Sequence, residues 1–99
     1  MARFDIYQIE RTEGYLLDIQ ADFLGHIDTR VVVPLLPSSI AATPLKTLNP
    51  IFRVGDDEVV MATQLLAAVP KSVLHKYAGS LSHQRDEIVR AVDFLMQGF

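Results

Sequence analysis

Apolar and polar side chains alternate in the stretch Phe4-Asp5-Ile6-Tyr7-Gln8-Ile9 near the start of the chain. A period of two predicts a strand with one apolar face. The pattern continues in kind in residues 15–20 (YLLDIQ), and the polar segment 10–14 between the two stretches ends in a glycine that can adopt a positive φ. These segments together predict a β-hairpin with a longer loop.

The next strand outward from this hairpin is predicted at residues 30–36 (RVVVPLL), which are mostly β-branched and aliphatic. Pro34 cannot donate a ladder hydrogen bond, so it predicts a sheet edge or a bulge at that point. Residues 37–50 contain three prolines. This segment is interpreted as a connecting arm with at most a turn of helix or a short strand.

A second hairpin is predicted farther along the chain. Residues 51–54 and 59–63 are apolar stretches that flank the turn-forming segment 55–58 (GDDE). Residues 69–74 (VPKSVL) are a candidate for one further short strand.

Only the C-terminal end of the chain shows helical periodicity. Its apolar residues fall at i, i+3, i+4 and i+7, namely Ile88, Ala91, Val92 and Leu95. The opposite stripe is polar and consists of Asp86, Arg90, Asp93 and Gln97. Ser82 is the predicted N-cap, and Gly98 is the predicted residue just past the helix end. Strands followed by one terminal helix predict a mostly β (α+β) fold.

The composition describes a small globular chain. It has 99 residues, of which 49% are hydrophobic and 21% charged, so it is too apolar for disorder and has room for a single domain over residues 1–99. The formal charge of −3 disfavours nucleic-acid binding by the chain alone. The absence of cysteine removes disulfides and thiolate chemistry. With no apolar signal segment or membrane-length run, a soluble, cytoplasmic protein is expected.

Side chains that could carry chemistry are scattered along the sequence. His26, His75 and His83 lack the spacing of a zinc site and are interpreted as surface or cap residues. The acidic run 56–58 lacks the spaced oxygen ligands of a calcium loop and is interpreted as a solvated turn. The five glycines occur singly, so there is no phosphate-binding loop. No catalytic, cofactor or metal site is predicted.

The end of the predicted helix is unusual for an amphipathic helix packed on a sheet. It finishes on Met96 and Phe99 with Gly98 between them, where polar residues are expected. Two interpretations stay open. Either Phe99 folds back to plug the core, or an exposed apolar tip serves as a contact anchor.

Five short motifs recur together in the order and spacing of a known family. They are residues 18–22 (DIQAD), 30–35 (RVVVPL), 54–58 (VGDDE), 68–70 (AVP) and 81–83 (LSH), followed by a helix that ends in Gly98-Phe99. Each motif alone is weak, whereas five in register with matching length are specific. Over essentially its whole length the chain resembles the CcdB toxins of bacterial type II toxin–antitoxin modules.

The resemblance implies an SH3-like barrel of the CcdB/MazF type, with an antiparallel sheet, a small extra sheet and one C-terminal helix. It implies a homodimer that binds the A subunit of DNA gyrase and traps the enzyme with cleaved DNA, without a reaction of its own. A CcdA-like antitoxin would neutralise this toxin and bind the operon's promoter with the toxin as co-repressor. DNA contact would then be indirect, which fits the acidic charge.

The family's gyrase contacts fall on two parts of this sequence. The larger part lies on the last helical turn and beyond it, at Asp93, Met96, Gln97, Gly98 and Phe99. The smaller part comprises Ala21, Phe23 and Leu24. The best-known family pattern ends in Trp-Gly-Ile, so Gln97 stands at the tryptophan position and Phe99 at the isoleucine position. Glutamine keeps hydrogen bonding but loses most of the stacking area.

Two other functions stay open. The MazF toxins are endoribonucleases that share this barrel and use an arginine and a hydroxyl residue near strand starts, and Thr29-Arg30 is loosely comparable. For Arg30, structural pairing with a neighbouring acid is the favoured interpretation. The third possibility is a relative that has lost gyrase poisoning and retains antitoxin binding.

Overall fold

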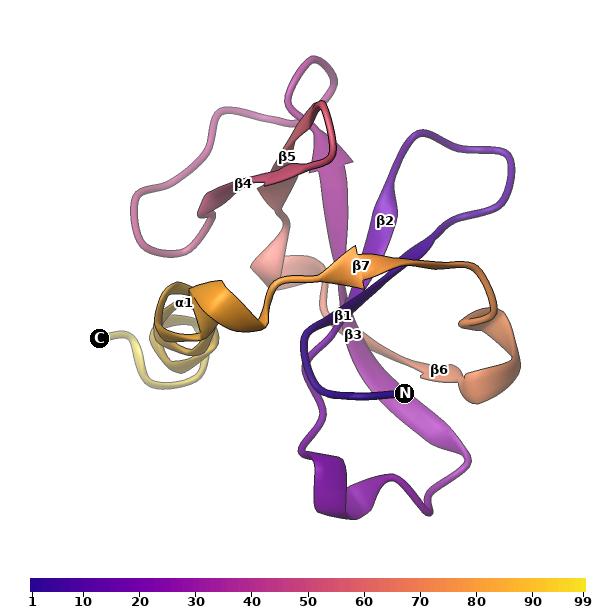
Figure 1. Cartoon of the computed structure of the whole chain (residues 1–99). Helices are drawn as coiled ribbons and strands as arrows, with labels where there is room; N and C mark the ends of the chain where they lie inside the picture. Colours follow the sequence, from indigo (N-terminus) through magenta and orange to yellow (C-terminus); the bar gives the residue numbers. More distant parts are fainter.

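The strands of the chain form one curled antiparallel sheet (Figure 1). The computed structural model describes every residue from Met1 to Phe99. The strand order is β4-β5-β3-β2-β1-β7, and β6 pairs with β3 off this path. The strands are β1 Asp5–Gln8, β2 Tyr15–Asp18, β3 Thr29–Pro37, β4 Ile51–Val54, β5 Asp57–Met61, β6 Ala67–Pro70 and β7 Tyr77–Ser80. Four short 3-10 turns and one helix complete the fold: η1 Asp22–Leu24, η2 Thr63–Leu65, η3 Lys71–Val73, η4 Ser82–Gln84 and α1 Arg85–Gln97.

The predicted N-terminal hairpin is confirmed. β1 pairs with β2 in antiparallel register with Ile6 opposite Leu17, and both side chains are buried. The other face of β1 is covered too, because Tyr7 packs with Val32 and Leu74 in a second, smaller cluster. Alternation in the sequence therefore predicted the strand, but not the covering of its second face.

β3 is the spine of the sheet because it pairs with three other strands. β2 lies along one side of β3, while β6 and β5 share the other side. Pro34 lies where the partner changes from β6 to β5, and its carbonyl oxygen accepts a hydrogen bond from the Ala62 N–H at 2.9 Å. The missing N–H of Pro34 thus faces a break between two partner strands rather than an outer edge, which explains a proline inside a central strand.

The predicted fold class is confirmed. The structure is mostly β, with a curled half-barrel sheet and one C-terminal helix. The expected small extra sheet is not separate, because all seven strands belong to one sheet from which β6 branches at β3.

Two predicted segments have different boundaries in the structure. The second hairpin is confirmed, but its turn is shorter than predicted because β5 already begins at Asp57. The prediction of one strand over residues 69–74 is wrong. β6 ends at Pro70, and the Leu74 N–H donates to the Lys71 carbonyl oxygen at 2.9 Å, which closes η3 as a turn.

β7 has no counterpart among the predicted strands. Its sequence, Tyr-Ala-Gly-Ser, shows no alternation, and Gly79 has a φ of +130° that few other residues adopt. The strand exists because β1 offers it a pairing edge, with a register shift between Ile6 and Tyr7. Such a partner-dependent strand leaves little signal in its own sequence.

The C-terminal helix is confirmed, with a later start than predicted. Residues 82–84 form η4, and α1 begins at Arg85. Ser82 is therefore not the N-cap. Its N–H instead donates to the Ser80 hydroxyl oxygen at 3.1 Å, and no side chain caps α1.

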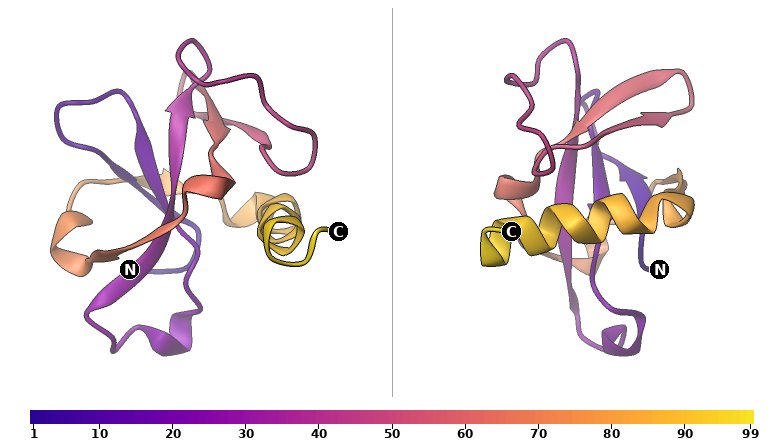
Figure 2. Two further views of the ribbon diagram at one scale, coloured as in Figure 1. Left: turned by 180° about the vertical axis from the view of Figure 1, so that it is seen from behind. Right: turned by 90° about the vertical axis from the view of Figure 1, so that its left-hand side faces the viewer.

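The faces and the end of α1 agree with the sequence. Ile88 and Ala91 are fully buried, whereas the polar stripe faces solvent. Gly98 has a left-handed φ of +80° and donates its N–H to the Phe94 carbonyl oxygen at 2.8 Å, as predicted for the residue that ends the helix. Figure 2 shows α1 lying lengthwise across the sheet.

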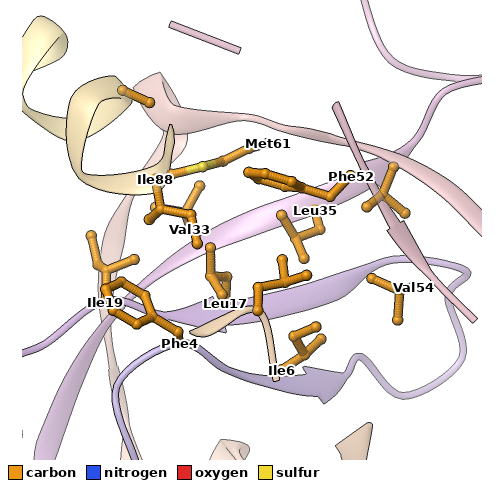
Figure 3. Packing of buried hydrophobic residues seen from close by; sticks show 13 residues of the cluster. Phe4, Ile6, Leu17, Ile19, Val33, Leu35, Phe52, Val54, Met61 and Ile88 are labelled. Carbon is orange, nitrogen blue, oxygen red and sulfur yellow. The ribbon is translucent and has the colours of Figure 1, made fainter. Parts of the chain in front are cut away.

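The main core lies between the sheet and α1, as Figure 3 shows. It contains 13 buried apolar residues drawn from most strands and from α1: Phe4, Ile6, Leu17, Ile19, Val33, Leu35, Phe52, Val54, Val59, Met61, Leu81, Ile88 and Ala91. Burial of these side chains is the main force that fixes α1 against the sheet.

The arm, which we define as residues 38–50, contains neither helix nor strand, as predicted. Asn49 nevertheless holds it firmly. Its side-chain amide donates to the Met61 carbonyl oxygen at 3.0 Å and its Oδ1 accepts from the Leu45 N–H at 3.0 Å. Thr63 adds a hydrogen bond from its hydroxyl to the Leu48 carbonyl oxygen at 2.5 Å.

Candidate binding surface

The last turn of α1 ends in an exposed apolar tip, which we define as Met96 and Phe99. Their exposed fractions are 64% and 84%, so Phe99 does not plug the core. Phe94 and Leu95 are half-buried and hold the turn on the domain. Because Gly98 adopts the left-handed conformation there, the chain turns out of the helix and carries Phe99 into solvent.

The polar residues predicted at this site surround the tip. Asp93 and Gln97 are both exposed and continue the solvent-facing stripe of the helix. A partner that contacts the tip would therefore meet an apolar centre beside a carboxylate and an amide. That is the usual arrangement of a protein-binding patch, with apolar anchors and a polar rim.

The second predicted group lies on the segment we call the η1 loop, residues 21–25. Phe23 is 81% exposed, whereas Ala21 and Leu24 are half-buried. The Arg3 N–H donates to Oδ1 of Asp22 at 2.7 Å, which ties this loop to the start of β1. Phe23 is thus a second isolated aromatic side chain held in solvent.

One chain does not bring these two groups together. Ala21 lines a hollow of about 400 Å³ with Ser82 and Arg85, which lie at the start of α1. The apolar tip lies at the other end of that helix, and 13 residues at ~1.5 Å each span about 20 Å. In Figure 2 the segment between β2 and β3 and the C-terminal end of α1 lie apart, so the predicted site residues form two separate patches on the monomer.

A buried polar network underlies the η1 loop. Nη2 of Arg30 lies 2.7 Å from Oδ2 of Asp18, and the two side chains are 1% and 0% exposed. Burial raises the pKa of the Asp18 carboxyl, against the lowering effect of its hydrogen bond with Arg30. The backbone N–H of Gln20 completes this carboxylate's contacts by donating to Oδ1 at 3.0 Å.

The structural interpretation of Arg30 is confirmed. Its guanidinium forms an ion pair with Asp18, and its Nη2 donates to the Gln20 carbonyl oxygen at 3.4 Å. Thr29 is exposed at the start of β3, but the arginine beside it points into the domain. Arg30 in this position cannot contact an RNA phosphate at the surface.

The other polar candidates remain dispersed. His26, His75 and His83 are exposed, and no group of three His, Asp or Glu side chains is placed to hold a metal ion. The predicted acidic turn at 56–58 is solvated, although Asp57 belongs to β5 rather than to the turn. The Tyr15 hydroxyl donates to Oδ2 of Asp57 at 2.8 Å; this hydrogen bond, followed by burial, raises the pKa of Tyr15.

Sequence reasoning missed two features of this surface. One is the role of Gln20, which lies in the motif at residues 18–22 and whose side chain holds the η1 loop by two hydrogen bonds. The other is a hollow of about 520 Å³ between the arm and α1, with Leu45 and Ile51 on one side and Arg90 on the other. Both depend on segments that meet only in the fold, so neither has a local sequence signal.

The fold defines the class of protein first. A solved structure of an endoribonuclease from mycobacterial species is similar to this chain, with a TM-score of 0.76 and 15% identity over 97% of this chain and 90% of that one. At this identity the likeness concerns the fold alone, and it defines a small SH3-like barrel with a terminal helix. No helix of the structure has the length and apolar character needed to cross a membrane.

A comparison of the sequence with known protein families identifies the family within this fold class. Residues 3–98 match the family described as CcdB protein. The chain belongs to the CcdB family, the toxins of toxin–antitoxin systems, which confirms the resemblance carried by the five motifs.

Proposed function

We propose that this chain is a type II toxin that binds the DNA gyrase A subunit, traps the complex with cleaved DNA, and catalyses no reaction itself. The observation that carries the proposal is the apolar tip, where Phe99 is 84% and Met96 64% exposed on a well-anchored helical turn. Large apolar side chains held in solvent at a fixed position are typical of protein-binding anchors. Membership of the CcdB family supports the toxin role.

In this proposal Phe99 takes over from the family's tryptophan as aromatic anchor. Gln97 lies on the solvent-facing stripe of α1, so its amide can exchange hydrogen bonds with gyrase but offers little area. Phe99 lies two residues farther on, beyond the left-handed turn at Gly98, and restores an aromatic surface in a different position. Asp93 and the η1 loop, with Ala21, Phe23 and Leu24, would supply the remaining contacts.

We further propose a homodimer in the cytoplasm that a CcdA-like antitoxin neutralises. Only 24 of 99 residues are buried in one chain, and large apolar side chains stay exposed at Leu45, Ile51 and Leu65. A second copy would cover such surface. The charge of −3 fits contact with promoter DNA only through the antitoxin, with the toxin as co-repressor.

Binding to the breakage–reunion domain of a gyrase A subunit tests the proposal. Deletion of Gly98 and Phe99 should weaken binding by about thirtyfold or more, on the order of 2 kcal/mol for an aromatic anchor. The same deletion should lower the unfolding midpoint only slightly, since it removes the hydrogen bond from Gly98 to Phe94 at the end of α1 but no core contact. Ile40→Ala is the matched control, because Ile40 is 68% exposed in the turn that follows β3 and lies outside both patches.

The outcomes separate the candidate functions. Equal affinity of the deletion variant and the full chain would place the gyrase site elsewhere. No gyrase binding by the full chain, combined with tight antitoxin binding, would identify a relative that has lost poisoning.

An endoribonuclease function is the weaker candidate. The shared barrel supports it, but the buried ion pair of Arg30 with Asp18 removes the arginine from the surface. Incubation of the purified protein with cellular RNA tests it, with Thr29→Ala as the variant because Thr29 is exposed. Specific cleavage that Thr29→Ala abolishes would overturn the binding-only proposal.

A further inference from the structure

The η1 loop keeps an aromatic side chain in water without any help from the core. Phe23 is 81% exposed and belongs to neither apolar cluster, and the 3-10 turn that carries it has only three residues. A turn this short has few internal hydrogen bonds, so its shape must be imposed from outside. The contacts beneath it therefore decide how Phe23 is presented.

Gln20 supplies the central contact. Its Nε2 donates to the carbonyl oxygen of Leu24 at 3.1 Å, at the far end of the loop. Its Oε1 accepts from the Val31 N–H on β3 at 3.1 Å. One buried side-chain amide, 9% exposed, thus joins the loop to the spine of the sheet.

The ion pair below fixes Gln20 in turn. Oδ1 of Asp18 accepts from the Gln20 N–H, and Nη2 of Arg30 donates to the Gln20 carbonyl oxygen. The guanidinium also lies close under the loop, since a Cβ added at Gly25 would stand 3.6 Å from its Nη1. Lys71 completes the support by donating from Nζ to the Gly25 carbonyl oxygen.

Stability alone does not explain this arrangement. A buried ion pair is commonly no more stabilising than apolar residues of similar volume, whereas its directional bonds fix one geometry. Here Arg30 and Asp18 bond to each other, and the remaining side-chain hydrogen bonds of the network begin or end on Gln20 or on the loop that follows it. The geometry that the network fixes is therefore the geometry of the η1 loop.

We propose that Gln20 is a positioning residue that holds the η1 loop in one conformation, so that Phe23 meets gyrase already ordered. The proposal rests on the proposed function for its partner. An anchor that is ordered before binding does not lose conformational freedom when the complex forms, so the network raises affinity without touching the partner.

Gln20→Met tests this role, because methionine has a similar length and cannot make the two side-chain hydrogen bonds. We expect its dissociation constant for the gyrase domain to rise about tenfold, a typical effect of lost preorganisation. Amide hydrogen exchange should accelerate in residues 21–25 and stay unchanged in α1. Gln20→Asn, which keeps an amide that is too short to reach both partners, should act in the same direction and serves if Gln20→Met does not fold.

Asn49→Leu is the matched control. Asn49 is also a buried amide, 7% exposed, and it anchors the arm instead of the η1 loop. Its replacement should lower stability comparably and leave gyrase affinity within about twofold, because the arm lies outside both patches.

A double-mutant cycle separates positioning from general destabilisation. If Gln20 acts mainly through Phe23, Gln20→Met should have a much smaller effect on affinity in a Phe23→Ala background, where only the Ala21 and Leu24 contacts of the loop remain. Equal effects in both backgrounds, or unchanged exchange in residues 21–25, would overturn the inference. Failure of the unaltered chain to bind gyrase would instead overturn the proposed function, while the exchange measurement would still report whether Gln20 orders the loop.

Discussion

Arg30 and Asp18 form an ion pair in the interior of the domain, with Nη2 and Oδ2 2.7 Å apart. The Nε of Arg30 donates to the same oxygen at 2.9 Å. The exposed fractions are 1% for the arginine and 0% for the aspartate, so water cannot replace either partner. Each charge therefore depends on the other for its solvation.

Removal of one partner should destabilise the protein strongly. We expect Asp18→Asn to lower the free energy of unfolding by about 3–5 kcal/mol, because it leaves the Arg30 charge buried without a counterion. Urea unfolding measures the change. The double variant Asp18→Leu/Arg30→Met should recover much of the loss, and a single variant within about 1 kcal/mol of the unaltered protein would contradict the buried-pair interpretation.

Replacement of Gly98 should act through the backbone alone. Its φ is +80°, and no atom lies within 4 Å of a Cβ added there. Gly98→Ala should cost about 1 kcal/mol of stability from the left-handed conformation, and Gly98→Asn should cost less. Thermal unfolding measures both changes. Gly14→Ala is the comparison, because the added Cβ there would meet the Leu35 carbonyl oxygen at 3.1 Å. Gly14→Asn should therefore destabilise the protein no less than Gly14→Ala.

An aromatic residue restored on the solvent-facing stripe should strengthen gyrase binding. We expect Gln97→Trp to lower the dissociation constant by about tenfold or more, because tryptophan adds stacking area beside the apolar tip. Isothermal titration calorimetry or surface plasmon resonance measures the dissociation constant. Asp86→Trp on the same stripe, in the first turn of α1, is the control and should leave affinity unchanged. An equal increase in gyrase affinity for both variants would indicate non-specific hydrophobic binding and would contradict the prediction.

The Tyr15 phenol should titrate above its usual pKa of 10.0, because it donates a hydrogen bond to the Asp57 carboxylate and is partly buried. The neutral phenol is favoured in the folded state, so this contribution to stability is fully present below pH 10 and is lost as the pH rises through the raised pKa. The phenolate absorbance, taken as the difference from Tyr15→Phe, follows the titration. Asp57→Asn should lower the pKa, and an unchanged value would exclude the hydrogen bond as its cause.

The elements with a local pattern were predictable. Alternation predicted β1 and β2, and helical spacing with a following glycine predicted α1 and its end at Gly98. β7 and the start of α1 were missed for a common reason. β7 depends on the edge of β1, and the turn at residues 82–84 is closed by backbone hydrogen bonds instead of by the Ser82 side chain.

The candidate site divides in the same way. Its residues are those that the resemblance to the CcdB family implies, and the helical phase of Gln97 follows from its spacing. The support from Gln20, Asp18 and Arg30 does not, because it joins positions 12 residues apart through the turn between β2 and β3. The sequence of a strand does not show whether a polar side chain in it will find a hydrogen-bond or ion-pair partner in another segment.

Periodicity within single segments predicted the fold class, most of the strands and the terminal helix, and the order and spacing of five motifs along the chain indicated the family. Only the packing of distant segments put Phe99 in solvent, buried Arg30 against Asp18, and placed Ala21 near the start of α1 while the apolar tip lies at its end. The physical reason is that exposure and pairing depend on which distant segments pack together, and that packing is settled by the burial of the whole core.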